Sequence, residues 1–168
     1  MARSNGEIYR DETRRRSRLN GTTLMKTPFS GGCACGAIRY ECTAEPMVML
    51  QCHCRDCQRV TGGACVYVVV VPTQAFKLTR GTPRYHFTES EAIGIHRRGF
   101  CADCGSPVTG AENRDGTRGI VGITAASLDD PSEFRSQLHA WVSDAQPWDQ
   151  MDPALPKFEK YPPSGKKN

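Results

Sequence analysis

The stretch QCHCRDCQR, residues 51–59, places three cysteines, Cys52, Cys54 and Cys57, within six positions. A structural zinc site normally has four protein ligands, whereas a catalytic zinc site has three and keeps one exchangeable position. The function of the chain therefore depends on whether a fourth ligand joins these three cysteines. The same ligands also decide how the fold is held together.

Four further cysteines occur as close-spaced pairs on either side of this stretch. Cys33 and Cys35 form a C-x-C pair, and Cys101 and Cys104 form a C-x2-C pair. Zinc sites are commonly built from such pairs, and a glycine follows each pair, where a turn around a metal often needs a positive φ. The two pairs supply the four thiolates of a closed structural site. The triplet is then left with three ligands and an open position.

Three other residues are candidates for the missing fourth ligand. Cys42, Cys65 or His53 could complete the triplet, which would make both zinc ions structural. Cys42 and Cys65 lie in apparent strands, where a lone cysteine is more often a small apolar core residue. His53 stands between two ligands, so we expect its ring to point away from their metal. A redox set of thiols without a metal is a further alternative.

The cysteine count and the polar N-terminal segment predict a cytoplasmic metalloprotein. Nine cysteines are an odd number for a disulfide framework, and residues 1–26 contain no apolar segment typical of a signal peptide. No run of 18 apolar residues occurs, so we expect no membrane-spanning segment. Translation from Met25, with residues 1–24 lying upstream of the natural protein, is an alternative that the sequence leaves open.

The charge distribution argues against a nucleic-acid-binding domain. The chain has a net charge of +4, and residues 1–27 hold seven Lys and Arg against three acids, which accounts for the whole excess. The remaining fifteen basic and fifteen acidic residues balance, so the basic surface of a phosphate-binding domain is not expected. We interpret residues 1–27 as a disordered basic arm, residues 28–150 as the zinc-binding domain, and residues 151–168 as a tail.

The apolar pattern indicates a mainly β domain with little helix. Short alternating or β-branched runs predict strands at residues 36–42, 48–51, 93–100, 118–124 and 138–143. The run ACVYVVVVP, residues 64–72, predicts a central, well-buried strand. Residues 76–81 and 83–90 are expected to form a hairpin that turns at Gly81. Residues 127–134 predict one helical turn, with Ser127 or Asp130 as the cap.

Three thiolates around zinc favour a thiol as the substrate. They give the site about one net negative charge, so bound water should be acidified less than at a three-histidine zinc. A soft thiolate suits such a site, and its sulfur could be held while a carbon–sulfur bond forms or breaks. Arg55 and Arg59 could offset the charge or bind a substrate carboxylate. Trp141 and Trp148 are expected to pack against the sheet or cap the core rather than line a pocket over the open zinc.

Five segments of the sequence together resemble one known family. They are GGCACGAIRYEC (31–42), CHCRDCQRVTGG (52–63), RRGFCADCGSPV (97–108), SLDDP (127–131) and LHAWVSDAQPW (138–148). In this order and spacing they resemble the glutathione-dependent formaldehyde-activating enzymes, which share their domain with centromere protein V. The resemblance implies a β-tent fold of antiparallel sheets with two zinc ions, one structural and one catalytic.

The resemblance also implies a ligand set and a reaction. Cys33, Cys35, Cys101 and Cys104 would hold the structural zinc, and Cys52, Cys54 and Cys57 the catalytic zinc, whose open position receives the substrate thiol. The implied activity is that of a carbon–sulfur lyase acting on S-hydroxymethylglutathione or a similar thiol adduct of formaldehyde. The implied partner is therefore a small thiol such as glutathione, and a homodimer is a fair default. The alternative is a non-catalytic binding module in which both zinc ions are structural.

Overall fold

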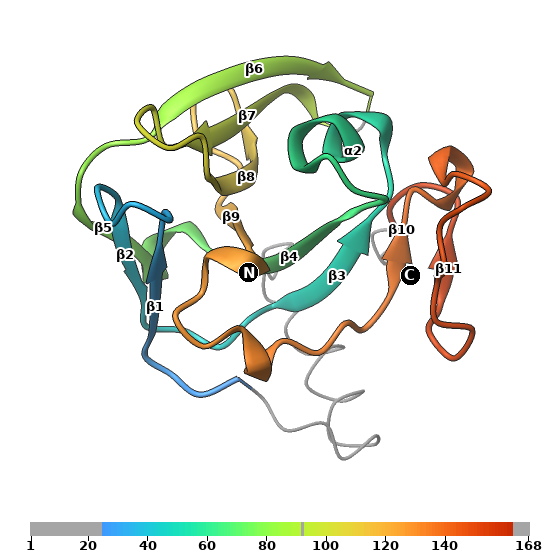
Figure 1. The fold of residues 1–168 in the computed structure, drawn as a ribbon, viewed down its shortest axis with the longest axis horizontal. Helices are drawn as coiled ribbons and strands as arrows, with labels where there is room; N and C mark the ends of the chain where they lie inside the picture. The colour runs from blue at the N-terminus through green and yellow to red at the C-terminus, as the bar shows by residue number, and fades with distance from the viewer. Residues whose placement is uncertain (1–24, 92, 163–168) are drawn as a thin grey trace, which may run out of the picture.

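The computed structural model describes residues 25–91 and 93–162, and it folds them into two β-sheets (Figure 1). The smaller sheet has three antiparallel strands in the order β1-β2-β5. These strands are β1 (Phe29–Gly32), β2 (Arg39–Cys42) and β5 (Phe76–Arg80). In Figure 1 this sheet stands on the side opposite to the C-terminal strands.

The larger sheet has eight strands in the order β11-β10-β3-β4-β9-β8-β7-β6. Its strands are β3 (Val48–Cys52), β4 (Val66–Pro72), β6 (Arg84–Ser90), β7 (Gly94–Phe100), β8 (Pro107–Asn113), β9 (Ile120–Thr124), β10 (His139–Ala140) and β11 (Lys157–Phe158). Neighbouring strands are antiparallel, except that β10 runs parallel to both β3 and β11. The prediction of a mainly β domain is confirmed.

Within residues 25–91 and 93–162, one α-helix and four 3₁₀ turns connect the strands. They are α2 (Arg55–Thr61), η1 (Thr73–Ala75), η2 (Ala125–Ser127), η3 (Pro131–Glu133) and η4 (Val142–Asp144). The helical turn predicted after Asp130 is confirmed, because the side chain of Asp130 accepts a hydrogen bond from the backbone N–H of Ser132. Helix α2 was not predicted, and neither was β8, whose sequence shows weak alternation. Within the described residues no helix is long and apolar enough to span a membrane.

Strand β4 is central, as predicted, and divides the interior into two parts. It pairs with β3 on one side and β9 on the other. Because side chains alternate along a strand, Val69 and Val71 point toward the smaller sheet, where they join Tyr40 in the main core. The alternate residues, including Val68 and Val70, face the opposite side with a second apolar cluster. Both faces of β4 therefore need apolar residues, which explains the unbroken run.

The predicted hairpin of residues 76–81 and 83–90 is wrong. Strand β5 pairs with β2 in the smaller sheet, whereas β6 pairs with β7 in the larger one. Gly81, with φ of +67°, turns the chain between the two sheets. A β-carbon on Gly81 would lie 2.2 Å from the carbonyl oxygen of Ala37, so the sharp turn depends on glycine. The local turn signal was real, but the sheets to which the flanking strands belong are set by long-range packing.

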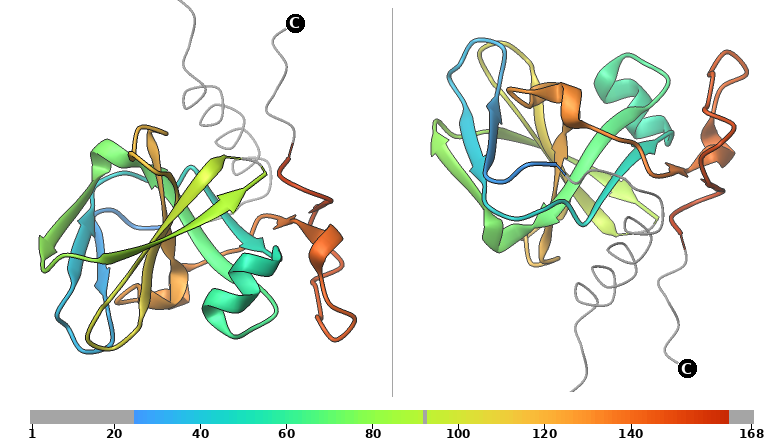
Figure 2. Two further views of the ribbon diagram at one scale, coloured as in Figure 1. Left: turned by 90° about the horizontal axis from the view of Figure 1, so that it is seen from above. Right: turned by 90° about the horizontal axis from the view of Figure 1, so that it is seen from below.

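The C-terminal segment, residues 141–162, lies at the edge of the molecule beside α2 in both views of Figure 2. Strand β11 within it pairs with β10, His139 opposite Lys157, so the segment expected as a tail contributes a strand to the larger sheet. The predicted strand over residues 138–143 is reduced to β10, because η4 begins at Val142. Residues 1–24 of the expected N-terminal arm lie outside the described residues.

Candidate metal centres

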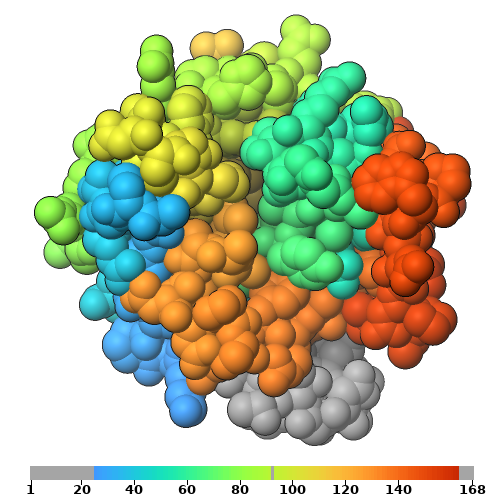
Figure 3. Space-filling model, viewed as in Figure 1, coloured from blue at the N-terminus to red at the C-terminus, as the bar shows by residue number. Residues whose placement is uncertain are grey.

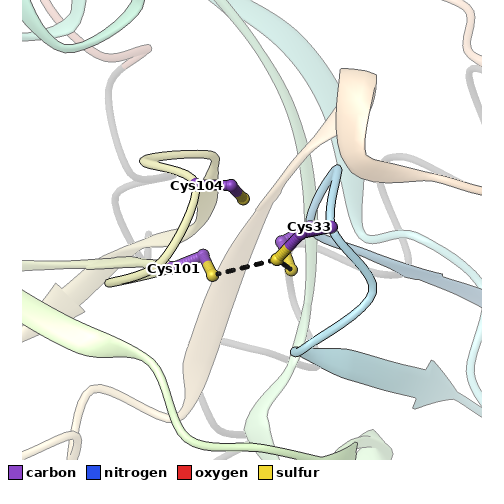
Figure 4. A group of neighbouring side chains, drawn as sticks. Cys33, Cys101 and Cys104 are labelled. Carbon is purple, nitrogen blue, oxygen red and sulfur yellow. Dashed lines mark hydrogen bonds between the residues drawn. The ribbon is translucent and has the colours of Figure 1, made fainter.

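The two cysteine pairs come together from two turns that are far apart in the sequence. Cys33 and Cys35 lie between β1 and β2, and Cys101 and Cys104 lie between β7 and β8. Their four sulfur atoms all lie within 4.8 Å of one another. Figure 4 shows the sulfurs of Cys33, Cys101 and Cys104 directed toward one another from these turns. The cluster bridges the two sheets.

The spacing of these sulfurs fits a tetrahedral zinc ion. The sulfur of Cys35 lies 3.5 Å from that of Cys33 and 3.7 Å from that of Cys101. With zinc–sulfur bonds of about 2.3 Å, the sulfurs of a tetrahedral site are separated by about 3.8 Å. Four thiolates at these separations satisfy a tetrahedral ion completely, and no position remains for a substrate.

Backbone groups around the pairs are arranged to support thiolates. Gly36 and Gly105 adopt φ of +76° and +75°, which confirms that the glycine after each pair takes the left-handed conformation. The N–H of Ile38 donates a hydrogen bond to the sulfur of Cys33 over 3.2 Å. The hydroxyl of Ser106 lies 3.2 Å from the sulfur of Cys104 and helps to lower the pKa of that thiol to about 5. Donors aimed at sulfur favour the charged form that binds a metal.

The triplet is assembled by the end of β3 and the beginning of α2. Cys52 is the last residue of β3, Cys54 is the N-cap of α2, and Cys57 lies within the helix. Their sulfurs also lie within 4.8 Å of one another, and no fourth Cys, His, Asp or Glu of residues 25–91 and 93–162 joins them. The helix that the sequence analysis missed is therefore what places Cys57 beside the other two.

The pKa values of the triplet thiols favour the binding of a cation. Hydrogen bonds from the thiols of Cys52 and Cys57 lower the pKa of Cys54 to about 2. The pKa of Cys52 is raised, first because its thiol donates to Cys54 and further because it is buried. Cys54 is therefore the sulfur of the three that most favours the thiolate, and a bound metal would displace the protons of the other two. This donor set, three sulfurs without oxygen or nitrogen, fits a thiophilic ion such as zinc.

His53 is held away from the triplet sulfurs, as expected from its place between two candidate ligands. Its ring is fully buried. Its Nδ1 lies 2.5 Å from an oxygen of Asp149, and its Nε2 lies 2.9 Å from Nδ1 of His139. Both ring nitrogens therefore have partners, so His53 does not offer the triplet a lone pair in this arrangement.

A buried row of hydrogen bonds connects Asp149, His53 and His139. Asp149 accepts from Nδ1–H of His53, and Nε2 of His53 shares a hydrogen bond with Nδ1 of His139. The Nε2 atom of His139 is buried and has no hydrogen-bond partner among the described residues. Asp149 and His139 were missed in the sequence, because β10 reaches β3 only through the parallel pairing of His139 with Gln51.

Cys42 and Cys65 lie outside both clusters. Cys42 is fully buried in the main core, and burial raises the pKa of its thiol. Cys65 is also buried, and its sulfur lies 3.7 Å from the side-chain oxygen of Gln51. Cys42 is therefore a core residue of a strand, as expected, whereas Cys65 is buried just before β4 and belongs to neither apolar cluster.

A cavity of about 710 Å³ opens beside the triplet, with Cys52 and Cys57 in its wall. Its lining comes from the second face of the larger sheet, from α2 and from the C-terminal segment. In Figure 3 the surface is hollowed between α2 and the yellow and orange segments. The closed cluster differs, because none of its four cysteines lines this cavity. The chain therefore holds one cluster enclosed by its own ligands and one that meets a cavity of ligand size.

The charged groups of the cavity are not those that the sequence indicated. Arg98, which is buried, and Arg118 line it, whereas Arg55 and Arg59 do not. Arg55 bonds Gln58 instead, and the side chain of Arg59 is 71% exposed. His86 and His96 also line the cavity. Alternation in β7 was a usable signal, because His96 and Arg98 share a face of that strand.

The two tryptophans do not line the cavity. Trp141 packs edge-on against Tyr161, with ring centroids 5.9 Å apart, and so belongs to the second apolar cluster. Trp148 is 64% exposed, so the expectation that it packs against the sheet or caps the core is wrong. The C-terminal segment that carries Trp148 contacts the sheet through other residues, among them the strand β11.

Comparison with known proteins yields one family match that covers most of the described chain. The family described as glutathione-dependent formaldehyde-activating enzyme matches residues 28–144. Three curated proteins whose names place them in that family are similar to this chain. They come from Phaeosphaeria nodorum (26% identity; 84% of this chain, 78% of that protein), Talaromyces marneffei (27%; 74%, 68%) and Colletotrichum graminicola (25%; 74%, 67%).

One solved structure is also similar at a lower level. It is a crystal structure of a Rhodobacter sphaeroides protein, with 16% sequence identity and a TM-score of 0.47. The alignment covers 77% of this chain and 98% of that one.

Proposed function

This chain belongs to the family of glutathione-dependent formaldehyde-activating enzymes, and on that premise we propose that it is a zinc-dependent enzyme of the carbon–sulfur lyase type. In this proposal Cys33, Cys35, Cys101 and Cys104 hold a structural zinc ion. Cys52, Cys54 and Cys57 hold a catalytic one, and the substrate is a thiol or its adduct with formaldehyde.

The observation that carries the proposal is the contrast between the two clusters. Four sulfurs enclose one site, whereas three sulfurs form the other at the wall of a cavity of about 710 Å³. Three protein ligands beside a ligand-sized space are typical of a catalytic rather than a structural zinc site. A purely structural role for both sites would leave the cavity beside the triplet without a function.

The proposed reaction joins a thiol to an aldehyde, or reverses that addition. The sulfur gives an electron pair to the carbonyl carbon, the carbonyl π pair moves to oxygen, and the proton lost by the thiol ends on that oxygen. When bound, zinc would supply the Lewis acid that favours the deprotonated form of the substrate sulfur. The three cysteines would fix where that sulfur lies, and the apolar cavity wall would limit the water around it.

Arg98 supports this assignment through its charge. Its guanidinium donates to the hydroxyl of Thr88 and lies 3.8 Å from a carboxylate oxygen of Asp56. It is buried, and its charge acts on Cys54 and Cys57. A cation in this position offsets part of the negative charge that three thiolates and a substrate thiolate bring together.

The test compares zinc content and activity in a variant that alters the triplet and in a variant that alters a cysteine outside both clusters. The full chain should carry two zinc ions and should accelerate exchange between formaldehyde and its 2-mercaptoethanol adduct, followed by NMR line broadening. C57S should retain one zinc ion and lose the acceleration at least 100-fold, with unchanged circular dichroism. C65S, which alters a buried cysteine outside both clusters, serves as the matched control and should keep both properties. Retention of the acceleration in C57S would refute the proposal.

A further inference from the structure

We propose that His96 is a catalytic residue of the triplet site, and that its Nδ1–H donates a hydrogen bond to the oxygen of the aldehyde or of its thiol adduct. This inference rests on the proposed function and deepens it by naming the group that binds the substrate oxygen. Two observations support it: the place of His96 in the cavity wall, and a backbone hydrogen bond that fixes the tautomer of its ring.

His96 lies on a face of β7 that borders the triplet. It is 7% exposed, and it lines the cavity whose wall also contains two of the triplet cysteines. Arg98, on the same face of β7, has its guanidinium 3.8 Å from a carboxylate oxygen of Asp56 in α2, the helix that carries Cys57. Burial lowers the pKa of His96 to about 4, and the charge of the Cys54 sulfur acts in the opposite direction, so that sulfur is within electrostatic reach of the ring.

The backbone of β8 fixes the tautomer of His96. The N–H of Ala111 donates to Nε2 of His96 over 2.8 Å. A backbone N–H can only donate, so Nε2 carries the lone pair, and the proton of the neutral ring is on Nδ1. Because the pKa of His96 is about 4, the ring is neutral at pH 7, and this tautomer is the form present.

The Nδ1–H group of His96 is a donor that the fold does not use. Within the described residues the ring makes one hydrogen bond, the one at Nε2. The unpartnered Nε2 of His139 is fully buried, whereas Nδ1 of His96 is not. Since the rest of the ring is enclosed by protein and the residue lines the cavity, Nδ1–H opens into the cavity.

A bulge in β8 holds Ala111 in position for this hydrogen bond. The pairing of β7 with β8 shifts between Arg97 and Gly99, where β8 has one residue more than β7. Ala111 adopts φ of +59° there, which is unusual for a residue with a β-carbon. Its N–H donates to His96, and its carbonyl oxygen accepts from Arg118 over 2.8 Å. Bulges and strained backbone of this kind are common where a side chain has to be aimed into a site.

A neutral N–H donor suits an oxygen on which negative charge develops. As the sulfur adds to the carbonyl carbon, the carbonyl π pair moves to oxygen, and a donor already in place stabilises the transition state more than the ground state. Neutral imidazole is used in this way by other enzymes that polarise a carbonyl group. The proton stays on Nδ1 throughout, and the proton that ends on the product oxygen is the one lost by the thiol.

The first experiment uses two variants that separate the two ring nitrogens. The side-chain oxygen of Gln is as many bonds from the β-carbon as Nε2, and the side-chain nitrogen of Asn is as many bonds away as Nδ1. H96Q therefore keeps the acceptor for Ala111 and lacks the donor, whereas H96N keeps the donor and lacks that acceptor. We expect H96Q to keep both zinc ions and to slow exchange between formaldehyde and its 2-mercaptoethanol adduct about 100-fold.

A purely structural role of His96 predicts the opposite order of the two variants. We expect H96N to unfold at lower urea concentration than H96Q and yet to retain more of the acceleration. Acceleration in H96Q within about threefold of the unaltered chain, or a larger loss in H96N than in H96Q, would overturn the inference.

The second experiment tests whether the donor contacts the substrate oxygen. Thioacetate carries its oxygen on the carbon bonded to sulfur, as the adduct does, and ethanethiol has the same skeleton without that oxygen. In titrations of the cobalt(II)-loaded chain followed by its visible spectrum, H96Q should weaken binding of thioacetate about tenfold and leave ethanethiol unchanged. An equal effect on both thiols would overturn the inference and leave the proposed function standing. A spectrum of the unaltered chain that responds to neither thiol would overturn both.

Nitrogen-15 NMR of the unaltered, zinc-loaded chain with labelled histidine provides a test that needs no variant. We expect His96, recognised by its hydrogen bond from the N–H of Ala111, to show a protonated Nδ1 and an unprotonated Nε2. Thioacetate should shift the Nδ1–H resonance, and ethanethiol should not. A proton on Nε2, or an Nδ1–H resonance that does not respond to bound thioacetate, would overturn the inference.

Discussion

Removal of the carboxylate of Asp149 is the substitution that tests the buried support of the triplet most sharply. Asp149 accepts from His53 over 2.5 Å, and the two side chains are 6% and 0% exposed. In D149A the Nδ1–H of His53 loses its acceptor in a place where water cannot replace it. The row of hydrogen bonds continues from His53 to His139, so D149A also disturbs the orientation of the His139 ring.

The size of the effect can be worked out from these contacts. A hydrogen bond to a charged group contributes about 1.5–3 kcal/mol, and a buried donor without a partner costs about 1–3 kcal/mol. We expect D149A to lower the free energy of unfolding by about 2–3 kcal/mol. D149N keeps an acceptor oxygen and should lose about 1 kcal/mol.

The assay combines urea denaturation at pH 7.5 with zinc transfer to a chromophoric chelator. Because His53 lies between Cys52 and Cys54, we expect D149A to speed release of the zinc held by the triplet and to leave the other zinc unaffected. D129A is the matched control, since Asp129 is 46% exposed and its ion pair with Arg39 should be worth under about 1 kcal/mol. A stability of D149A within about 0.5 kcal/mol of the unaltered chain, or equal acceleration of both zinc ions, would refute the reasoning.

Three other substitutions test separate parts of the account. R97M leaves Glu112, 6% exposed, without its partner at 2.5 Å, so it should cost about 3–5 kcal/mol in urea denaturation. The double variant R97M/E112L should recover most of that loss, and an equal loss in both would contradict the assignment. The buried His96 has a pKa of about 4 against an ordinary 6.5, so the folded state binds fewer protons and loses about 3 kcal/mol as the pH falls from 6.5 to 4. H96Q should flatten that pH dependence, and an unchanged slope of the free energy of unfolding against pH would refute the role of His96. G36A places alanine at φ of +76° and should cost about 1–2 kcal/mol, whereas G63A, where a β-carbon makes only ordinary contacts and φ is not positive, should cost nothing measurable.

The cysteine clusters and the central strand could be predicted because their signals are local. Each pair lies on one turn, so its spacing is set within a few residues, and Gly36 follows from the backbone geometry of that turn. The run that forms β4 has to satisfy two buried faces, and its composition records that requirement. The sorting of cysteines into four and three followed from counting, without knowledge of the topology.

The remaining features depend on pairings that no local pattern contains. His139 reaches His53 only because β10 runs parallel to β3, with Ala140 opposite Cys52. Arg98 enters the cavity because β7 turns that face toward the triplet, and the sequence shows only that His96 and Arg98 share a face. The failed hairpin at Gly81 has the same cause, since a tight turn does not say which sheets its flanking strands join.

The central claim is that one metal site is closed by four cysteines and the other is open on three, and ¹¹³Cd NMR of the cadmium-loaded chain tests it most directly. We predict two resonances, one at a shift typical of four sulfur ligands and one displaced by a lighter fourth ligand. Addition of 2-mercaptoethanol should move only the second resonance, to the four-sulfur position. Two four-sulfur resonances before the thiol is added, neither of which responds to it, would contradict the account.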